Sequence, residues 1–259
     1  MSYEDLIVEL AGEHVGAISL NRPEHMNTFT SRMARELSRA LWEFEENPQV
    51  RVILLKSAGK SFCAGIDINE LQEKTAIEYR AWIEQMEQPL VAMSQIRKPV
   101  IAQVQGVAAA NGMGLAVAAD LVIAADDARM GLTAINVGLN CVGPVIPVAR
   151  VVGRKKALEL LLFGDLIGAG EAMGLGLVNR VVPKNDLSEE ALAWAVTLAK
   201  KSPVAVQIAK KAYYGSEDMS YQQQFDYMND AFARLCTTRD AKEGVAAFLE
   251  KRDPDWQGC

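Results

Sequence analysis

Residues 106–114 read Gly-Val-Ala-Ala-Ala-Asn-Gly-Met-Gly, and this stretch constrains the fold more than any other. It follows residues 99–105, which predict a strand, and it opens a helix that is predicted to run to about Ala119. Backbone N–H groups at a helix N-terminus are unpaired and carry partial positive charge. The spacing matches neither a GxxxxGKS/T phosphate loop nor a GxGxxG dinucleotide loop. The stretch therefore predicts a strand, a tight turn and a helix N-terminus that can face an oxyanion.

A second stretch of small residues, 59–67, reads Gly-Lys-Ser-Phe-Cys-Ala-Gly-Ile-Asp and follows a predicted strand at residues 50–56. Open α/β sheets bind ligands beyond the carboxyl ends of their strands, and small side chains let a ligand approach the backbone closely. One N–H group from each stretch could together stabilise one developing oxyanion. Each stretch is also compatible with an ordinary connection whose small residues permit close packing.

Hydrophobic patterning predicts an α/β fold followed by helices. Paired strands are expected at residues 6–10 and 15–20, a helix capped by Thr30, a long helix at 76–97 and another strand at 120–125. Strands that alternate with helices indicate crossover units around a mostly parallel sheet. The last third of the chain is predicted to be helical only, and one helix carries an apolar stripe that fits either the core of the chain or a contact with another subunit. The stripe consists of Tyr221, Phe225, Met228, Phe232 and Leu235.

The composition disfavours several classes of protein. The 259 residues are 50% hydrophobic with a formal net charge of −6, which argues against a nucleic acid or an anionic membrane as the partner. Two uncharged runs, 99–119 and 130–149, reach the length of a membrane span, but polar residues or prolines interrupt them, which indicates burial in a soluble domain. The first ten residues lack the basic region of a targeting segment. Two histidines and four scattered cysteines predict no metal site, reduced thiols and a cytoplasmic protein.

Several short motifs, in order along essentially the whole chain, resemble the enoyl-CoA hydratase/isomerase (crotonase) family, and in particular its hydratase domain-containing protein 3 type. A single motif of this kind is weak, whereas this many in register make the resemblance specific. The motifs are Leu-Asn-Arg-Pro at 20–23 with Asn27, Ser-Phe-Cys-Ala-Gly-Ile-Asp at 61–67, Lys-Pro-Val-Ile-Ala at 98–102, the stretch 106–114 with Asp120, the segment 171–182, Glu-Gly at 243–244, and Phe-Leu-Glu-Lys-Arg-Asp-Pro at 248–254.

The resemblance implies an α/β fold in which residues 1–195 form a crotonase-type spiral of ββα units that binds acyl-CoA. Residues 196–259 would then be a C-terminal helical trimerisation region, giving a homotrimer or a dimer of trimers. An acyl-CoA thioester is implied as the substrate, with no tightly bound cofactor. The backbone N–H groups of Ala64 and Asn111 would form the oxyanion hole, although the family usually has glycine where Asn111 stands. Other residues implied in substrate binding are Gly65, Ile66, Asp67 and Gly112, with Met26 in a CoA-contacting loop and Lys251 near a phosphate bound by a neighbouring subunit.

Relatives that hydrate enoyl thioesters use two glutamates, and the matching positions here are Gly114 and Ala134. A general base that activates water and an acid that protonates Cα each contribute roughly 10²- to 10⁴-fold, so losing both would cost on the order of 10⁴ to 10⁸ in rate. Tentative substitutes are Asn140, which could orient water, and Cys141, a possible nucleophile. An isolated thiol without a base is more often a buried small apolar residue.

Two more carboxylates, Glu84 and Glu87, lie on the helix that walls the acyl pocket in relatives, and they are expected on a solvated face. We therefore predict an enoyl-CoA hydratase/isomerase family protein that acts on an acyl-CoA thioester through a backbone oxyanion hole. The alternatives are a non-catalytic acyl-CoA-binding paralogue, or another crotonase chemistry such as thioester hydrolysis or decarboxylation.

Overall fold

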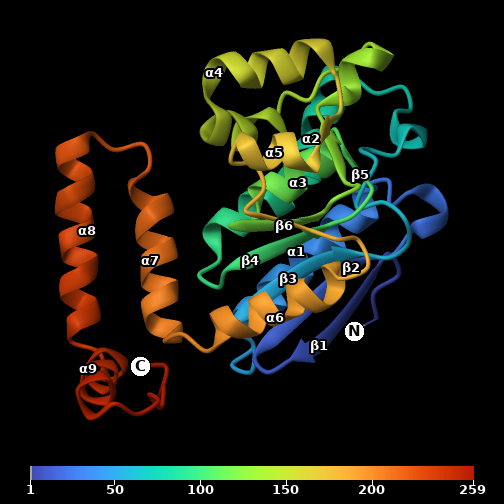
Figure 1. The fold of residues 1–259 in the computed structure, drawn as a ribbon. Coiled ribbons are helices and arrows are strands. Elements are labelled where there is room, and N and C mark those ends of the chain that lie inside the picture. The colour runs from blue at the N-terminus through green and yellow to red at the C-terminus, as the bar shows by residue number, and fades with distance from the viewer. Residues whose placement is uncertain (1) are drawn as a thin grey trace.

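The computed structural model describes residues 2–259 and is built around a six-stranded sheet (Figure 1). The strand order is β1-β2-β3-β4-β6-β9, with β1 antiparallel to β2 and every later pair of neighbours parallel. This confirms the predicted strand pair and the mostly parallel sheet. The strands are β1 (Leu6–Gly12), β2 (Val15–Leu20), β3 (Val52–Ser57), β4 (Val100–Val104), β6 (Leu121–Ala125) and β9 (Arg180–Val182).

Helices cover both faces of this sheet (Figure 1). Alternate side chains of a strand point to opposite faces, so that Ile18 of β2 is buried in one core and Ala17 in the other. The first core is larger and is filled by long side chains, whereas the second is closed by a helix that presents alanines such as Ala191 and Ala195. The helices are α1 (Ser31–Glu46), α2 (Ala76–Gln95) and α3 (Asn111–Ala118) on the first face and α6 (Leu187–Ala199) on the second.

Helix starts follow local signals in the sequence. The Thr30 hydroxyl accepts the Met33 N–H at 3.1 Å at the start of α1, as predicted. A capping box formed by Thr75 and Glu78 begins α2, so that two N–H groups at its first turn are satisfied by side chains. These caps fix where α1 and α2 start, and with them the side chains that the two helices turn toward the site.

A smaller three-stranded sheet lies beside the first and carries the second small-residue stretch. Its strands pair in the order β5-β7-β8, and β5 follows β4 after the single turn at residues 105–106. The uncharged runs 99–119 and 130–149 are therefore divided among strands, turns and helices, and the second run ends within the first turns of α4. Among the described residues, no helix is both long and apolar enough to span a bilayer. The remaining elements are β5 (Val107–Ala109), β7 (Arg129–Gly131), β8 (Ile167–Gly168), η3 (Thr133–Val137), α4 (Val145–Phe163) and α5 (Ala169–Gly174).

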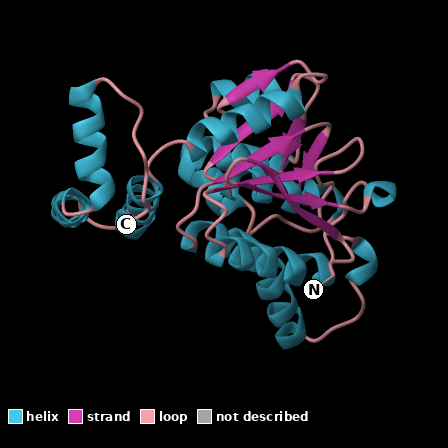
Figure 2. Cartoon of the chain, turned by 90° about the horizontal axis from the view of Figure 1, so that it is seen from below, coloured by secondary structure: helices cyan, strands magenta, loops and turns pink. Residues whose placement is uncertain are grey.

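The last three helices form an arm that stands apart from the rest of the chain (Figure 2). This C-terminal arm consists of α7 (Pro203–Ser216), α8 (Tyr221–Cys236) and α9 (Arg239–Glu250). Lys210 ties it to the body, because its Nζ donates to Asp120 Oδ2 at 2.7 Å and to the Lys98 carbonyl at 2.9 Å.

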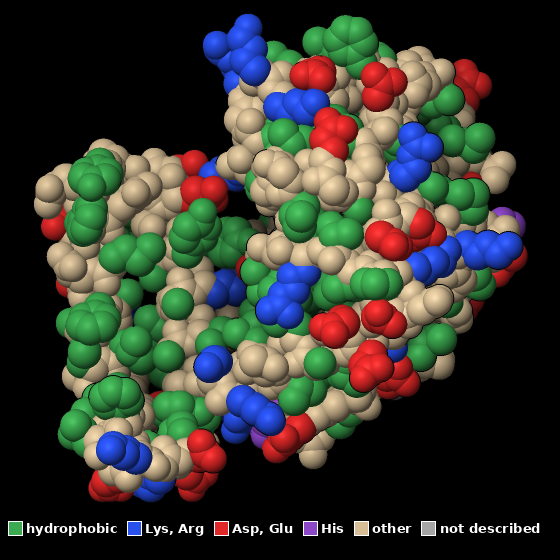
Figure 3. All heavy atoms as spheres, in the orientation of Figure 1, with side chains coloured by type: hydrophobic (Ala, Val, Ile, Leu, Met, Phe, Trp, Pro, Cys, Tyr) green, Lys and Arg blue, Asp and Glu red, His purple; other side chains and the backbone are tan. Residues whose placement is uncertain are grey.

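Hydrophobic side chains gather over the C-terminal arm in Figure 3. Three members of the predicted apolar stripe, Tyr221, Phe225 and Phe232, are exposed there, so a single copy of the chain does not bury them. Val245, Phe248 and Leu249 extend the same apolar surface over α9. The start of the helical region, predicted at residue 196, stays a prediction; α6 itself packs on the sheet as far as Ala199.

Candidate active site

The structure brings the two small-residue stretches together. Cys63 pairs with Ala108 as a short parallel bridge, in which the Cys63 N–H donates to the Val107 carbonyl at 3.1 Å and the Ala109 N–H donates to the Cys63 carbonyl at 2.9 Å. A Cβ atom at Gly112 would overlap the Cys63 carbonyl, so glycine is needed where the first turn of α3 meets the loop. Ala64 directly follows Cys63, and Asn111 lies two residues after Ala109 and directly before Gly112, so these contacts bring the segments of Ala64 and Asn111 together.

A strained turn at Ala110 opens α3. Ala110 has φ 50° and ψ −116°, a conformation that residues other than glycine rarely adopt and that costs about 1–3 kcal/mol. It is held by the Ala110 N–H, which donates to the Gly131 carbonyl at 2.7 Å, and by the Ala110 carbonyl, which accepts the Gly114 N–H at 3.2 Å. The strain is the consequence of turning the chain sharply from β5 into α3. The turn leaves the first N–H groups of α3 pointing out of the helix.

Asn111 is 1% exposed and carries polar groups that nothing in the chain satisfies. Within residues 2–259 its backbone N–H has no hydrogen-bond acceptor, and neither the oxygen nor the nitrogen of its side-chain amide has a partner. A buried polar group without a partner typically costs 1–3 kcal/mol. Native proteins leave few such groups, and they are expected where a ligand supplies the missing bond.

The N–H group of Ala64, the second predicted donor, already has a hydrogen-bond acceptor within the chain. The Ala64 N–H donates to the Met26 carbonyl at 3.1 Å, so the two predicted donors differ: one is free and the other bonded. Met26 follows η1 (Pro23–His25), and its side chain is 47% exposed. The next residue, Asn27, is fully buried and fixes the loop through its amide, which donates to the carbonyls of Ala58 and Ser61 at 2.8 Å each.

The carboxylate of Asp67 fixes the end of the small-residue stretch 59–67 through its contacts with two residues. Arg22 contacts it at 3.0 Å, and its carboxylate also accepts the Asn69 N–H at the start of the next turn. Burial alone would raise the pKa of Asp67, but these hydrogen bonds outweigh it and lower the pKa. Ile66 bridges to Phe29, and Phe29 N–H donates to the Gly65 carbonyl at 2.8 Å. The carbonyl of Gly65 and the carboxylate of Asp67 therefore have internal partners.

Gly114 and Ala134, the two positions predicted to match the family's glutamates, carry no ionisable group. A Cβ atom at Gly114 would lie 2.7 Å from Pro144 Cβ and 3.3 Å from Leu90 Cδ2, so the space around this residue is filled by its neighbours. Ala134 is partly buried in η3. Cys141 is buried, and desolvation raises the pKa of its thiol, which disfavours the thiolate that a nucleophile needs. Asn140 lies exposed on the surface.

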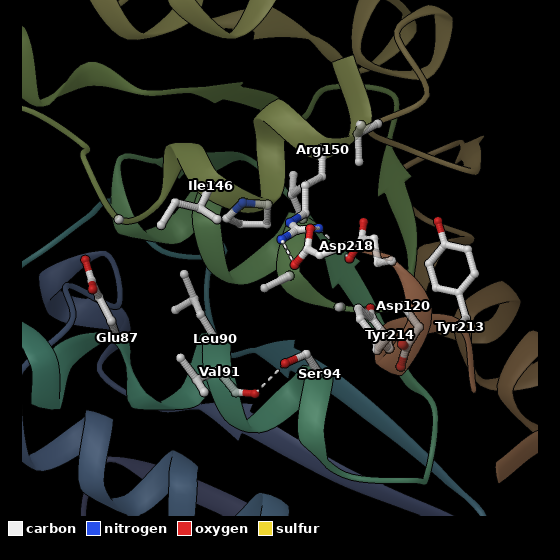
Figure 4. A pocket seen from close by; sticks show the side chains of 17 residues that line it. Glu87, Leu90, Val91, Ser94, Asp120, Ile146, Arg150, Tyr213, Tyr214 and Asp218 are labelled. Carbon is white, nitrogen blue, oxygen red and sulfur yellow. Dashed lines mark hydrogen bonds and ion pairs between the residues drawn. The ribbon is translucent and has the colours of Figure 1, made fainter. Parts of the chain in front are cut away.

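A cavity of about 510 Å³ lies between α2, α3, α4 and α7 (Figure 4). Glu87 and Leu90 of α2 form one end with Gly143, and Tyr213 of α7 lies at the other end. The expectation that Glu87 sits on a solvated face is wrong: it is half-buried and lines this cavity, and desolvation raises its pKa. The expectation holds for Glu84, which is exposed.

The half-buried position of Glu87 was not predicted, although the spacing of apolar residues in α2 indicates it. Met86, Leu90 and Met93 mark the buried face of α2, and Glu87 precedes Leu90 by three residues, which puts the two on one side of a helix. Lys251 lies elsewhere, at the end of α9 in the C-terminal arm, with φ 57°. Its predicted contact belongs to a neighbouring subunit and stays a prediction.

A parallel sheet with covering helices, two small-residue loops joined at its carboxyl edge and a helical C-terminal arm define a crotonase-type protein. A sequence profile of the enoyl-CoA hydratase/isomerase family matches residues 11–259. A putative enoyl-CoA hydratase of Thermus thermophilus is 37% identical over 252 residues, covering 96% of this chain and 99% of its own length. The chain belongs to the enoyl-CoA hydratase/isomerase family.

Solved structures agree with this assignment. An enoyl-CoA hydratase of Mycobacterium smegmatis is 35% identical and superposes with a TM-score of 0.94, covering 98% of this chain and 99% of that one. Human enoyl Coenzyme A hydratase domain-containing protein 3 is 31% identical and superposes with a TM-score of 0.93, covering 98% of this chain and 100% of that one. These matches confirm the predicted family and the crotonase-type fold, including its similarity to the domain-containing protein 3 type.

Proposed function

We propose that this chain binds an acyl-CoA thioester and polarises its carbonyl group between the backbone N–H groups of Ala64 and Asn111. The observation that carries the proposal is the free N–H of Asn111, held by a strained turn at the N-terminus of α3. Such an N–H carries partial positive charge and suits an oxygen that gains negative charge. Gly65, Ile66, Asp67 and Gly112 would line the thioester path around these two donors.

The loop that contains Met26 sets the condition for binding. Because the Met26 carbonyl accepts the Ala64 N–H at 3.1 Å, the thioester carbonyl has to replace it as the acceptor. Asn27 anchors the loop by three hydrogen bonds of 2.8 Å, so the exchange requires only a local rotation next to Met26. The side chain of Met26, 47% exposed, is free to contact the bound CoA.

The reaction does not use the usual pair of glutamates, because we assign their positions to Gly114 and Ala134. Removing both acid/base groups costs on the order of 10⁴ to 10⁸ in rate, while an oxyanion donor that persists still contributes about 10²- to 10³-fold. The protein is therefore a poor hydratase by the ordinary route, but it retains the means to stabilise a thioester enolate.

We further propose that the apolar surface of the C-terminal arm mediates assembly into a homotrimer or a dimer of trimers. A set of exposed aromatic and aliphatic side chains gathered over the two helices α8 and α9 is unusual for a monomer and marks an interaction site. Residues 1–195 would then act as the acyl-CoA-binding core, residues 196–259 as the oligomerisation region, and Lys251 would reach the ligand of a neighbouring subunit. We place the protein in the cytoplasm.

The proposal is tested with crotonyl-CoA labelled with ¹³C at the thioester carbonyl. Titration calorimetry should show binding of crotonyl-CoA. Isotope-edited infrared difference spectra should show the carbonyl stretch at a lower frequency than in water, because two N–H groups in a buried site polarise the bond more strongly. Binding without any shift would overturn the oxyanion hole, and no binding of crotonyl-CoA or CoA would overturn the function itself.

A further inference from the structure

Glu87 extends from α2 into the end of the cavity opposite Tyr213 (Figure 4). Its Oε1 atom lies against Gly143 so closely that a Cβ atom on Gly143 would overlap it. The carboxylate thus occupies the volume that any larger residue at position 143 would take. This close approach places an ionisable group within the wall of the cavity rather than in bulk solvent.

The same contact links Glu87 to the oxyanion donors. Gly143 is bonded to Pro144, and Pro144 packs directly on Gly114, one helical turn beyond Asn111 in α3. Three residues of an α-helix span about 4.5 Å along the axis. A thioester whose carbonyl oxygen lies on the Asn111 N–H, and whose acyl chain follows α3 toward Gly114, therefore extends its first carbon atoms toward Glu87.

The other charged side chains that line the cavity are already paired. Arg150 of α4 contacts Glu217 at 2.8 Å and Asp218 at 3.1 Å, and Asp120 contacts Lys210 at 2.7 Å. Within residues 2–259, Glu87 has no ion-pair or hydrogen-bond partner, and burial alone acts on its carboxylate, which is therefore free to take up a proton. Burial raises the pKa of Glu87 above its ordinary value.

We propose that Glu87 is the catalytic acid/base of this protein and that it moves a proton between two carbon atoms of an unsaturated acyl-CoA. The inference rests on the proposed function, because it needs the thioester carbonyl between Ala64 and Asn111. One carboxylate suits a reaction that begins and ends with the same protonation state of the enzyme. Isomerisation of a 3-enoyl thioester to the 2-enoyl thioester is such a reaction.

Each bond is accounted for in this step. The carboxylate of Glu87 takes the proton from Cα, and the electron pair of that C–H bond forms a double bond between the carbonyl carbon and Cα. The carbonyl π electrons move to the thioester oxygen, and the Cβ–Cγ double bond is kept, which gives a dienolate. The negative charge rests on the thioester oxygen, which the two N–H groups stabilise. The oxygen then re-forms the carbonyl, the double bond between the carbonyl carbon and Cα shifts to Cα–Cβ, and the electron pair of the Cβ–Cγ double bond takes the proton from the Glu87 carboxylic acid at Cγ. No water, oxidant or reductant is consumed.

The experiment follows 3-butenoyl-CoA with the purified full-length protein in D₂O by ¹H NMR. Wild-type protein should exchange the Cα protons and form 2-butenoyl-CoA. Glu87→Gln, which keeps the size of the side chain, should lower both rates by roughly 10²- to 10⁴-fold. Glu84→Gln changes an exposed glutamate on the same helix and should match the wild type. The wild-type rate should rise with pH and level off above the ordinary glutamate pKa of about 4.3, and this inflection should be absent in Glu87→Gln.

Calorimetry with crotonyl-CoA separates the possible failures. If both proteins bind and Glu87→Gln still exchanges and isomerises at the wild-type rate, Glu87 is not the acid/base, while the proposed function stands. If wild-type protein binds but neither exchanges nor isomerises 3-butenoyl-CoA, the inference is overturned in the same way. If wild-type protein does not bind, the proposed function fails first and the inference fails with it.

Discussion

Gly114→Ala is expected to destabilise the protein although alanine is the better helix former. Alanine gains about 1 kcal/mol over glycine in a helix interior. The added methyl group, however, would lie 2.7 Å from Pro144 Cβ and 3.0 Å from Pro144 Cα, inside the optimal carbon–carbon separation of about 3.5–4.0 Å. Overpacking of this kind typically costs 1–3 kcal/mol. The two effects together predict a net loss of about 0–2 kcal/mol in the free energy of unfolding.

Gly170→Ala is the matched control, because Gly170 lies in α5 and a Cβ atom there meets nothing within 4 Å. It keeps the gain in helix propensity and lacks the clash, so it should be neutral or stabilising. Urea unfolding of both variants at one protein concentration should place Gly114→Ala about 1–3 kcal/mol below Gly170→Ala, with equal m-values. Equal stability of the two variants would show that the space beside Gly114 is open, and that the site could accommodate a glutamate after all.

Three further predictions concern the arm, acid stability and assembly. Lys210→Met should cost about 3–5 kcal/mol in urea unfolding, because it leaves the carboxylate of Asp120 buried without its cation; a loss below 1 kcal/mol would contradict this. Burial alone would raise the pKa of Asp5, but hydrogen bonds to its carboxylate lower it. The stability that this carboxylate contributes is present above about pH 4 and should be lost as the pH falls through the lowered pKa. Asp5→Asn should flatten that part of the plot of unfolding free energy against pH. Phe248→Asp should yield monomers in light scattering. Ile77→Asp is the control, because Ile77 lies outside the arm and is as exposed as Phe248 (82% each), and it should leave the assembly intact. An unchanged mass for Phe248→Asp would refute the proposed interface.

Much of the fold follows from local signals that can be read in the sequence. The Thr30 hydroxyl caps α1 whatever the rest of the chain does, since the cap needs only residues up to Met33. The strand pair β1 and β2 is predicted for the same reason, because two short apolar runs flank one turn. Motif order adds the family and, through it, the arrangement of the sheet. These features depend on neighbours that are close in the sequence.

The parts that could not be predicted depend on contacts between distant segments. The bridge between Cys63 and Ala108 joins two segments 45 positions apart, and no feature of the sequence around either residue predicts this contact. The bond from the Ala64 N–H to the Met26 carbonyl is also non-local, and nothing in the sequence predicts that this one of the two proposed donors is bonded within the chain. Glu87 also could not be placed from the sequence, because its position in the cavity depends on Gly143, which is distant along the chain and contacts its carboxylate.

The contacts around Gly114 predict that Gly114→Glu alone does not create a working hydratase site. Glutamate at position 114 needs room for its side chain, yet Pro144 and Leu90 fill the space at the first atom, Cβ. The residue before Pro144 is Gly143, and the carboxylate of Glu87 lies over it. Shifting Pro144 to admit a glutamate would therefore move the backbone on which Glu87 rests. The glycine at position 114 and the placement of Glu87 are parts of one packing arrangement, so Gly114→Glu is expected to disturb the proposed acid/base Glu87 before it supplies another.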